Sequence, residues 1–180
     1  EVVLFDKNFK ALNNEIKNKC TCIKCDLSNK KEVIKSINRV VNQFGGIDIL
    51  ISNSGSAFQG QMKDLNEKVL QDSMANNFYS HHYIIQETVK IMINQSFGGS
   101  ISINLSKQSI NPGNNFGPYG IAKASALFMM KQYALECGKY NIRINGVNAD
   151  RIQSGLLTKE MIAQRAKARG IKEGDYLKNN

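Results

Sequence analysis

Short apolar runs alternate along this chain with longer segments in which apolar residues recur every three or four positions. The runs lie at residues 2–5, 20–25, 47–51, 100–105 and 141–147, and each has the length of a buried strand. The segments with helical spacing cover residues 9–16, 33–44, 65–93, 118–137 and the part beyond about 156. Strands that alternate with helices predict an α/β protein, in which helices cover both faces of a parallel sheet.

The ends of these elements carry ordinary boundary signals. Ser28 can cap the helix that carries Val33 to Phe44, and Gly45 follows that helix as a stop. Pro118 suits the first turn of the helix that follows it. No repeat, low-complexity tract or linker divides the sequence, and 180 residues suffice for a core. We therefore treat residues 1–180 as a single domain.

The composition is that of a globular protein, with 42% hydrophobic and 22% charged residues. No apolar run approaches the roughly 20 residues that a membrane span needs. The first residues, E-V-V-L-F-D, do not resemble a signal peptide. These features predict a cytoplasmic protein that makes no contact with a membrane.

The net charge of +9 raises the question of nucleic-acid binding. The lysines are spread along the chain, however, and no block of five like charges occurs. We interpret them as solvated helix faces and expect no nucleic-acid partner. A basic binding module is the functional alternative that we favour least.

Cysteine and histidine do not form a convincing metal site. Cys20, Cys22 and Cys25 are close in sequence, but a tetrahedral zinc site needs a fourth ligand, and no well-spaced histidine pair supplies it. We interpret the cysteines as small apolar residues of a strand and predict no metal. His81 and His82 are adjacent, and we expect them to face solvent or an interface without a chemical role.

Three residues around the fourth strand suggest acid–base chemistry. Tyr119 and Lys123 are four residues apart, so they share one face of the predicted helix. A free tyrosine has a pKa near 10, and a nearby lysine cation favours its phenolate form. Ser106 closes the preceding strand, and its hydroxyl can bind a reacting oxygen after the loop returns.

Other polar residues also follow predicted strands, at the edge where parallel α/β sheets bind ligands. They are Asp6, Asp26, Asn53, Ser106 and Asn148. Asp6 can accept hydrogen bonds from a ribose diol and would repel a 2′-phosphate, which favours NAD over NADP. The alternative is that Asp6 only caps the helix that follows it.

In order and spacing, these motifs resemble the short-chain dehydrogenase/reductase family. Ser106 lies thirteen residues before the Tyr119-x-x-x-Lys123 motif, and Ser52-Asn53-Ser54-Gly55 resembles the family's Asn-Asn-Ala-Gly turn. The resemblance implies a Rossmann-like doubly wound sheet and an NAD(P)-linked enzyme that interconverts an alcohol and a carbonyl compound. It makes Tyr119 the acid/base and Ser106 the ligand of the substrate oxygen. Lys123 lowers the tyrosine pKa and holds the nicotinamide ribose, so Tyr119 and Lys123 also contact the cofactor.

The resemblance assigns roles to further residues. It makes Asn77 the holder of a proton-relay water, although the neighbouring Asn76 leaves the register open. It places Asp26 and Leu27 near the adenine ring, where helix capping is an equally good account of Asp26. Asn53 and Gly55 would contact the cofactor, because Gly55 permits close backbone approach.

Within the family, the chain most resembles the dehydrogenase part of bifunctional rhamnulose-1-phosphate aldolase/dehydrogenases. The shared segments include S-K-Q-S-I-N-P-G-N-N-F-G-P-Y-G and V-N-A-D-R-I-Q-S-G-L-L-T. This resemblance implies a small sugar-derived substrate such as lactaldehyde. Because members of the family usually assemble as dimers or tetramers, the resemblance also implies a homodimer or homotetramer.

The chain also departs from the family pattern. Ala149-Asp150 replaces the usual Pro-Gly, and the chain contains no G-x-x-x-G-x-G turn for a pyrophosphate. The first and the last family strand are not found in it, which predicts two unpaired strand edges. The alternative function is therefore a catalytically silent fragment or subunit that acts through a partner chain. The intact Ser106, Tyr119 and Lys123 favour the enzyme.

Overall fold

The five predicted strands are present, but they form two separate parallel sheets. The computed structural model describes residues 1–150, 159–168 and 170–178. Strand β1 (Val3–Asp6) pairs with β2 (Thr21–Lys24), whereas β3 (Ile49–Ser52), β4 (Gly99–Asn104) and β5 (Ile142–Val147) form a three-stranded sheet in the order β3-β4-β5. In the described residues β1 and β3 are not paired with each other, which agrees with the predicted open edges.

Seven α-helices connect or follow the strands in the described part of the chain. They are α1 (Asn14–Lys19), α2 (Lys30–Phe44), α3 (Glu67–Met74), α4 (Ser80–Gln95), α5 (Gly117–Cys137), α6 (Lys159–Ala168) and α7 (Glu173–Lys178). A π-helical turn, η2 (Ala75–Tyr79), joins α3 to α4, so the predicted helix over 65–93 is one continuous rod with a widened turn in its middle.

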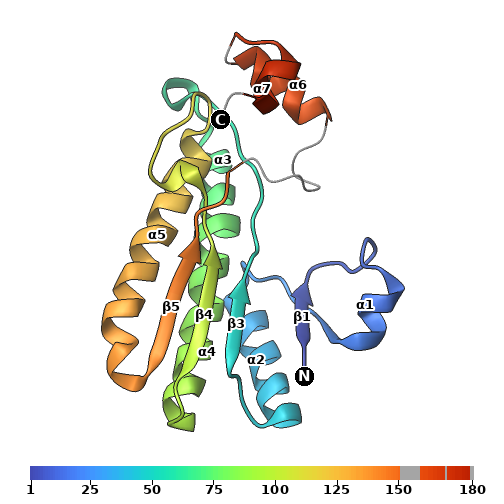
Figure 1. Cartoon of the computed structure of the whole chain (residues 1–180), viewed down its shortest axis with the longest axis vertical. Coiled ribbons are helices and arrows are strands. Elements are labelled where there is room, and N and C mark those ends of the chain that lie inside the picture. The colour runs from blue at the N-terminus through green and yellow to red at the C-terminus, as the bar shows by residue number, and fades with distance from the viewer. Residues whose placement is uncertain (151–158, 169, 179–180) are drawn as a thin grey trace.

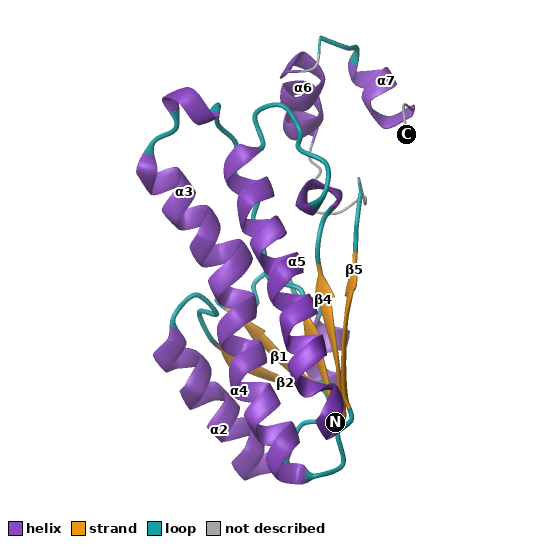
Figure 2. Cartoon of the chain, turned by 90° about the vertical axis from the view of Figure 1, so that its left-hand side faces the viewer, coloured by secondary structure: helices purple, strands orange, loops and turns teal. Residues whose placement is uncertain are grey.

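Helices α2, α4 and α5 lie together on one face of the three-stranded sheet (Figure 2). The helices cover this face because the buried isoleucines of β4 and β5 point to it. These are Ile101, Ile103, Ile142 and Ile144, which alternate along the two strands with residues of the other face. The intervening residues of β4 and β5 are Ser100, Ser102, Asn104, Arg143, Asn145 and Val147.

On the opposite face of this sheet, Ile49 and Ile51 of β3 are 69% and 72% exposed. Helices were expected on both faces, and in the described residues they cover only the isoleucine-rich one (Figure 1). With Val147 of β5, which is 57% exposed, Ile49 and Ile51 leave apolar surface on this second face uncovered in the described residues.

Two helix starts differ from the prediction. The first helix begins only at Asn14, because Asn13 caps it by accepting a hydrogen bond from the Glu15 backbone N–H. Phe9 and Leu12, expected within this helix, instead form a turn in which the Leu12 N–H donates to the Phe9 carbonyl at 3.1 Å.

Helix α2 is capped by Asn29 and not by Ser28. The Asn29 side chain accepts hydrogen bonds from the backbone N–H groups of Lys31 and Glu32. Ser28 donates instead to the Asp26 carboxylate at 2.6 Å. The end of α2 follows the prediction, with Gly45 in a left-handed conformation at a φ of 86°.

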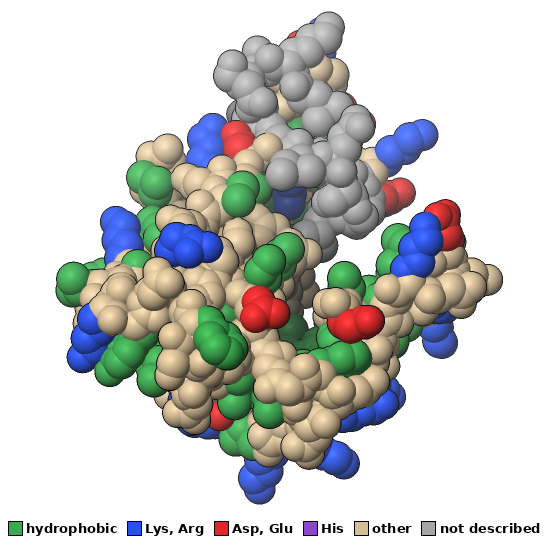
Figure 3. Space-filling model, turned by 60° about the horizontal axis from the view of Figure 1, so that its bottom comes forward, with side chains coloured by type: hydrophobic (Ala, Val, Ile, Leu, Met, Phe, Trp, Pro, Cys, Tyr) green, Lys and Arg blue, Asp and Glu red, His purple; other side chains and the backbone are tan. Residues whose placement is uncertain are grey.

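Positive charge does not gather on the face of the molecule drawn in Figure 3, where Lys and Arg side chains are scattered among polar and apolar ones. Among the described residues, no helix combines the length and apolar character required to cross a membrane.

Candidate active site

Ser106 lies directly beyond the carboxyl end of β4. It is 8% exposed, and its Oγ accepts a hydrogen bond from the Gln108 backbone N–H at 3.2 Å. This bond starts a short 3₁₀ turn, Lys107–Ser109, in the loop that leads to α5. The predicted position of Ser106 at a strand end is therefore confirmed.

Tyr119 and Lys123 lie in the first two turns of α5, and the structure brings them to the same place as Ser106. The Lys123 Nζ lies 5.9 Å from the centroid of the Tyr119 ring. It donates a hydrogen bond to the Asn104 carbonyl, the last of β4, at 2.8 Å. Lys123 is 3% exposed, so its ammonium group is held inside the protein at the end of the sheet.

The surroundings of Tyr119 act on its pKa in opposite directions. Burial raises the pKa, whereas a hydrogen bond with Ser106 and the charge of Arg165 lower it, and the net shift is upward. The sequence suggested that Lys123 would lower this pKa, but in the structure the lowering comes from Ser106 and Arg165. Burial also lowers the pKa of Lys123, to about 8, so this lysine remains mainly protonated at pH 7.

Arg165 of α6 is a site residue that the sequence did not indicate. Its Cζ lies 5.1 Å from the centroid of the Phe116 ring, at the start of α5. Its Nε is buried and has no hydrogen-bond partner within the described residues. No local spacing links α6 to Tyr119, so only the tertiary fold could show that this cation is near the phenol.

Asn77 lies in the π-helical turn and holds the loop that follows β3. The backbone N–H of Ser56 donates to its Oδ1 at 3.0 Å, and its Nδ2 donates to the Ser56 carbonyl at 2.9 Å. Asn76 bonds only to its own helix, at the Asp72 carbonyl. Of the two possible registers, Asn77 is therefore the one that faces the loop. Backbone groups of Ser56 occupy the Asn77 side chain, and its role in holding a relay water stays a prediction.

Gly55 is packed tightly against Asn77 and lies near Lys123. A Cβ at this position would lie 2.9 Å from the Asn77 Oδ1 and 3.6 Å from the Lys123 Nζ. Any larger residue would therefore displace the hydrogen-bonded amide of Asn77.

The other predicted polar residues of the three-stranded sheet join the same edge. The Asn104 Nδ2 donates to the Asn53 Oδ1 at 2.7 Å, which links the ends of β4 and β3. Asn148, after β5, lies near Ser109, with a distance of 3.5 Å from the Ser109 Oγ to its Oδ1.

Asp6 and Asp26 end the two strands of the smaller sheet. The Asp6 Oδ1 accepts a hydrogen bond from the Asn8 backbone N–H at 2.9 Å, so it caps a local turn and not a helix. Asp26 accepts from Ser28 and forms an ion pair with Lys7 at 3.1 Å. Partial burial raises the pKa of Asp26, but these partners outweigh it and lower the pKa overall.

Asp150 and Leu27 both have partners within the protein. Asp150, which replaces a family glycine, forms an ion pair with Lys107 at 3.0 Å, so its charge is balanced beside Ser106. Leu27 is half-buried and packs against the hydrophobic core. Its expected cofactor contact is untested.

His81 differs most from its prediction. It was expected to face solvent or an interface, but it is completely buried in α4. Its Nδ1 lies 2.7 Å from the Ser52 Oγ, and its Nε2 lies 3.2 Å from the Lys123 Nζ. The adjacent His82 lies in a groove between α4 and α5, where its Nδ1 is 3.4 Å from the Tyr133 hydroxyl.

Part of this arrangement fits a nicotinamide dinucleotide. Lys123 donates toward Asn104 and His81, and an ammonium group has a third N–H that can bind a ribose. At the other sheet, Asp6 is exposed at a strand end. These 180 residues contain no glycine-rich turn of the expected type, so no group among them is identified as a ligand of the pyrophosphate.

Comparison with known proteins shows the family to which this chain is similar. A family model described as enoyl-(acyl carrier protein) reductase matches residues 2–179. Short-chain dehydrogenase reductase 3a of Arabidopsis thaliana is 30% identical over 90% of this chain and 65% of its own length. The uncharacterized oxidoreductase YuxG of Bacillus subtilis is 28% identical over 91% of this chain, but over only 24% of its own length.

A solved structure of NAD⁺-bound xylitol dehydrogenase superposes with a TM-score of 0.84 at 24% identity. The superposition covers 92% of this chain and 66% of that one, and at this identity it shows a shared fold. The chain thus spans about two thirds or less of the length of these relatives.

Proposed function

The chain belongs to the short-chain dehydrogenase/reductase family, and from that premise we propose that it supplies the reaction centre of an NAD-dependent enzyme that interconverts an alcohol and a carbonyl compound. The observation that carries the proposal is the convergence of Ser106, Tyr119 and Lys123 at the carboxyl end of β4. The Lys123 Nζ bonds to the last carbonyl of that strand and lies 5.9 Å from the Tyr119 ring.

In this proposal each side chain performs one task. Tyr119 takes the hydroxyl proton of the substrate during oxidation and returns it to the carbonyl oxygen during reduction. Ser106 donates a hydrogen bond to that same oxygen. Lys123 holds the nicotinamide ribose, and the Ser106 hydroxyl and the Arg165 charge favour the phenolate of Tyr119. The bound nicotinamide would accept or return the hydride.

NAD is the cofactor that we propose, with NADP less favoured. The exposed Asp6 carboxylate at the end of β1 can accept from a ribose diol, and it would repel a 2′-phosphate. Asp26, Leu27, Asn53 and Gly55 complete the proposed cofactor contacts, with Asn77 supporting the loop after β3. The NAD⁺-bound state named for xylitol dehydrogenase is consistent with this choice.

For the substrate, we propose a small sugar-derived alcohol or aldehyde such as lactaldehyde. The proposal follows from the resemblance to the dehydrogenase part of bifunctional rhamnulose-1-phosphate aldolase/dehydrogenases. Xylitol, named for the solved relative, is also a small polyol.

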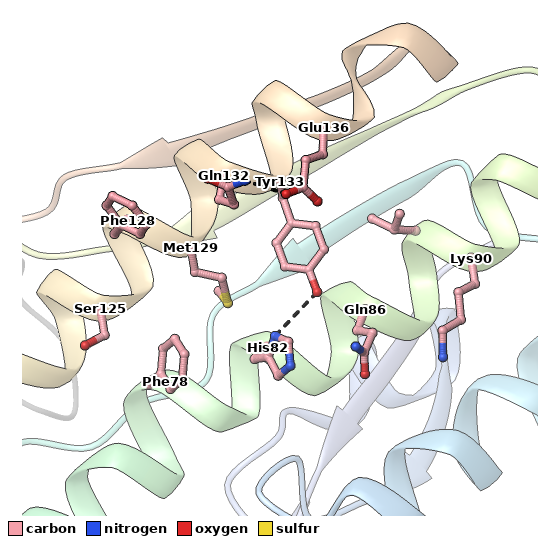
Figure 4. A pocket seen from close by; sticks show the side chains of 11 residues that line it. Phe78, His82, Gln86, Lys90, Ser125, Phe128, Met129, Gln132, Tyr133 and Glu136 are labelled. Carbon is pink, nitrogen blue, oxygen red and sulfur yellow. Dashed lines mark hydrogen bonds between the residues drawn. The ribbon is translucent and has the colours of Figure 1, made fainter.

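We further propose a cytoplasmic homodimer or homotetramer that associates through α4 and α5. These helices form a groove lined by aromatic and apolar side chains, among them Phe78, Phe128 and Met129 (Figure 4). Phe128 and Leu135 of α5 are 71% and 79% exposed. The groove contains none of Ser106, Tyr119 or Lys123, so association here would leave the reaction centre open.

The test is an assay of the natural-length protein with NAD and a panel of small polyols and hydroxyaldehydes. Tyr119→Phe should lower kcat by about 100- to 10,000-fold and leave NAD affinity within a few fold. Tyr140→Phe is the matched control, because Tyr140 is 41% exposed at the far end of α5 and should not change kcat. NAD binding without turnover by the unsubstituted protein would instead favour a silent subunit.

A further inference from the structure

Three buried polar side chains from three elements form a continuous hydrogen-bonded chain beside Tyr119. Ser52 ends β3, His81 lies in α4 and Lys123 lies in α5, with exposed fractions of 4%, 0% and 3%. The Ser52 Oγ and His81 Nδ1 are 2.7 Å apart, and the His81 Nε2 and Lys123 Nζ are 3.2 Å apart. The second and third members meet inside the protein, where water cannot easily replace either partner.

The Lys123 ammonium determines which tautomer of the His81 imidazole is present. An ammonium group can only donate, so the Nε2 of His81 must accept the hydrogen bond from Lys123. A neutral imidazole with an accepting Nε2 carries its proton on Nδ1, which therefore donates to the Ser52 Oγ. The lysine ammonium thus sets the tautomer, and the Ser52 hydroxyl accommodates it by accepting from Nδ1–H.

We propose that His81 is a positioning residue for Lys123, an uncharged imidazole whose Nε2 anchors the ammonium group. The inference rests on the proposed function in one respect, namely that Lys123 acts in the reaction. The Asn104 carbonyl at 2.8 Å is the second anchor. Two fixed acceptors use two of the three N–H donors and leave one for the cofactor ribose.

An apolar residue at position 81 would leave the ammonium with a single anchor. Lys123 has four methylene groups, so its Nζ would then move away from Tyr119 or draw water into the core. His81 therefore supplies the fixed position that the long side chain cannot provide alone.

The charges around this pair keep both protonation states as the proposal requires. Burial and the Lys123 cation lower the pKa of His81 to about 3. Burial lowers the pKa of Lys123 to about 8. The groups facing them are the Ser52 hydroxyl, the Asn104 carbonyl and the Tyr119 ring, and no carboxylate in the described residues forms an ion pair with Lys123.

The first test does not depend on turnover. These 180 residues contain two histidines, so ¹⁵N-histidine NMR gives two imidazole signal sets from them, and His81→Leu and His82→Asn assign those two sets. The expected result is a His81 imidazole protonated on Nδ1 that stays uncharged from pH 8 to 5. An Nε2–H tautomer, or titration near the ordinary histidine value, would overturn the proposal because Nε2 could then not accept from Lys123.

The second test measures the effect on Lys123. His81→Leu should lower kcat/KM by about 10- to 100-fold. It should also shift the alkaline limb of the pH profile of kcat/KM, which reports deprotonation of Lys123, toward lower pH, because the loss of an acceptor disfavours the ammonium form. His81→Gln, which retains an acceptor, should recover most of the activity and the position of that limb. An equal loss in both variants with no shift would show a packing role only and overturn the proposal.

The two tests separate the two levels of inference. If NMR gives the Nδ1–H tautomer but the natural-length protein has no NAD-linked activity, the proposed function fails and the anchoring of Lys123 stands. If the protein is active but the tautomer is the other one, the proposed function stands and the role of His81 fails.

Discussion

Lys123 is a charged residue kept almost entirely inside the protein, and its neighbours explain how that is possible. Burial lowers its pKa from 10.5 to about 8, so the ammonium form is less favoured than in water. Hydrogen bonds to the Asn104 carbonyl and to His81 offset part of the hydration free energy that the ammonium loses on burial. A residue held in this way is pre-organised, which is what a group that must meet a cofactor ribose requires.

His81 should make the protein sensitive to acid. Its pKa is about 3 in the folded state and 6.5 in the unfolded chain, so between these values the unfolded state binds more protons. Stability is therefore complete above pH 6.5 and is lost as the pH falls toward 3. From pH 6.5 to 4.5 we expect the native protein to lose about 2–3 kcal/mol relative to His81→Leu. Urea unfolding followed by circular dichroism at several pH values measures this difference.

The matched control for the acid effect is His82→Asn. His82 also has a lowered pKa, but it is only partly buried beside a groove, so its variant should differ from the native protein much less with pH. Parallel stability curves for the native protein and His81→Leu between pH 8 and 4.5 would contradict a neutral, buried imidazole at position 81.

At the scale of elements, the π-helical turn connects the long helix to the loop after β3. Asn77 in this turn binds both backbone groups of Ser56. Gly55 lies next to the same amide, where an added Cβ would approach the Asn77 Oδ1 to 2.9 Å. The turn, the loop and the glycine therefore form one packed unit at the edge that carries the candidate site.

Gly55→Ala should break this unit. The new methyl group must displace the Asn77 amide, so we expect a loss of about 1–3 kcal/mol in the free energy of unfolding and weaker NAD binding. Gly138→Ala is the control, because nothing lies within 4 Å of its Cβ position and its φ is −55°. That change should stabilise the protein by about 0.4–1 kcal/mol. Equal stability of the two variants in thermal unfolding would contradict the packing described for Gly55.

The elements themselves were largely predictable, since apolar periodicity alone located all five strands and the long helices. The errors arose where side chains compete for a backbone group. Ser28 and Asn29 are both good caps, and the pairing of Ser28 with Asp26 leaves Asn29 to cap α2. The π-helical turn left no mark in the sequence, because a single widened turn hardly changes an apolar stripe.

At the scale of the whole molecule, a position at a strand end was the signal in the residues themselves that parts far apart in sequence would meet, whereas Asn77 was indicated by the family resemblance. Ser106, Asn53 and Asn148 follow this rule, because parallel strands end at one edge. His81 and Arg165 do not, as both project from helices and reach the site through packing. The polarity of a histidine or arginine in a helix does not reveal whether it faces solvent, and that depends on the layers of the fold.

The layer of helices on one face also determines where a second copy could bind. Phe128 and Leu135 are 71% and 79% exposed on α5, beside the groove between α4 and α5. If copies associate here, the double variant Phe128→Glu/Leu135→Glu introduces charges into an apolar contact and should convert the oligomer to a monomer. Size-exclusion chromatography with light scattering on the natural-length protein measures this change in mass.

Phe97→Glu is the control that makes the result specific, because Phe97 is 78% exposed but lies beyond the end of α4, outside the groove. It should leave the mass of the oligomer unchanged. Dissociation by both variants would indicate general destabilisation, and dissociation by Phe97→Glu alone would place the contact elsewhere. Because Tyr119 and Lys123 do not line the groove, a monomer produced by the double variant should still bind NAD, so assembly and reaction centre can be tested separately.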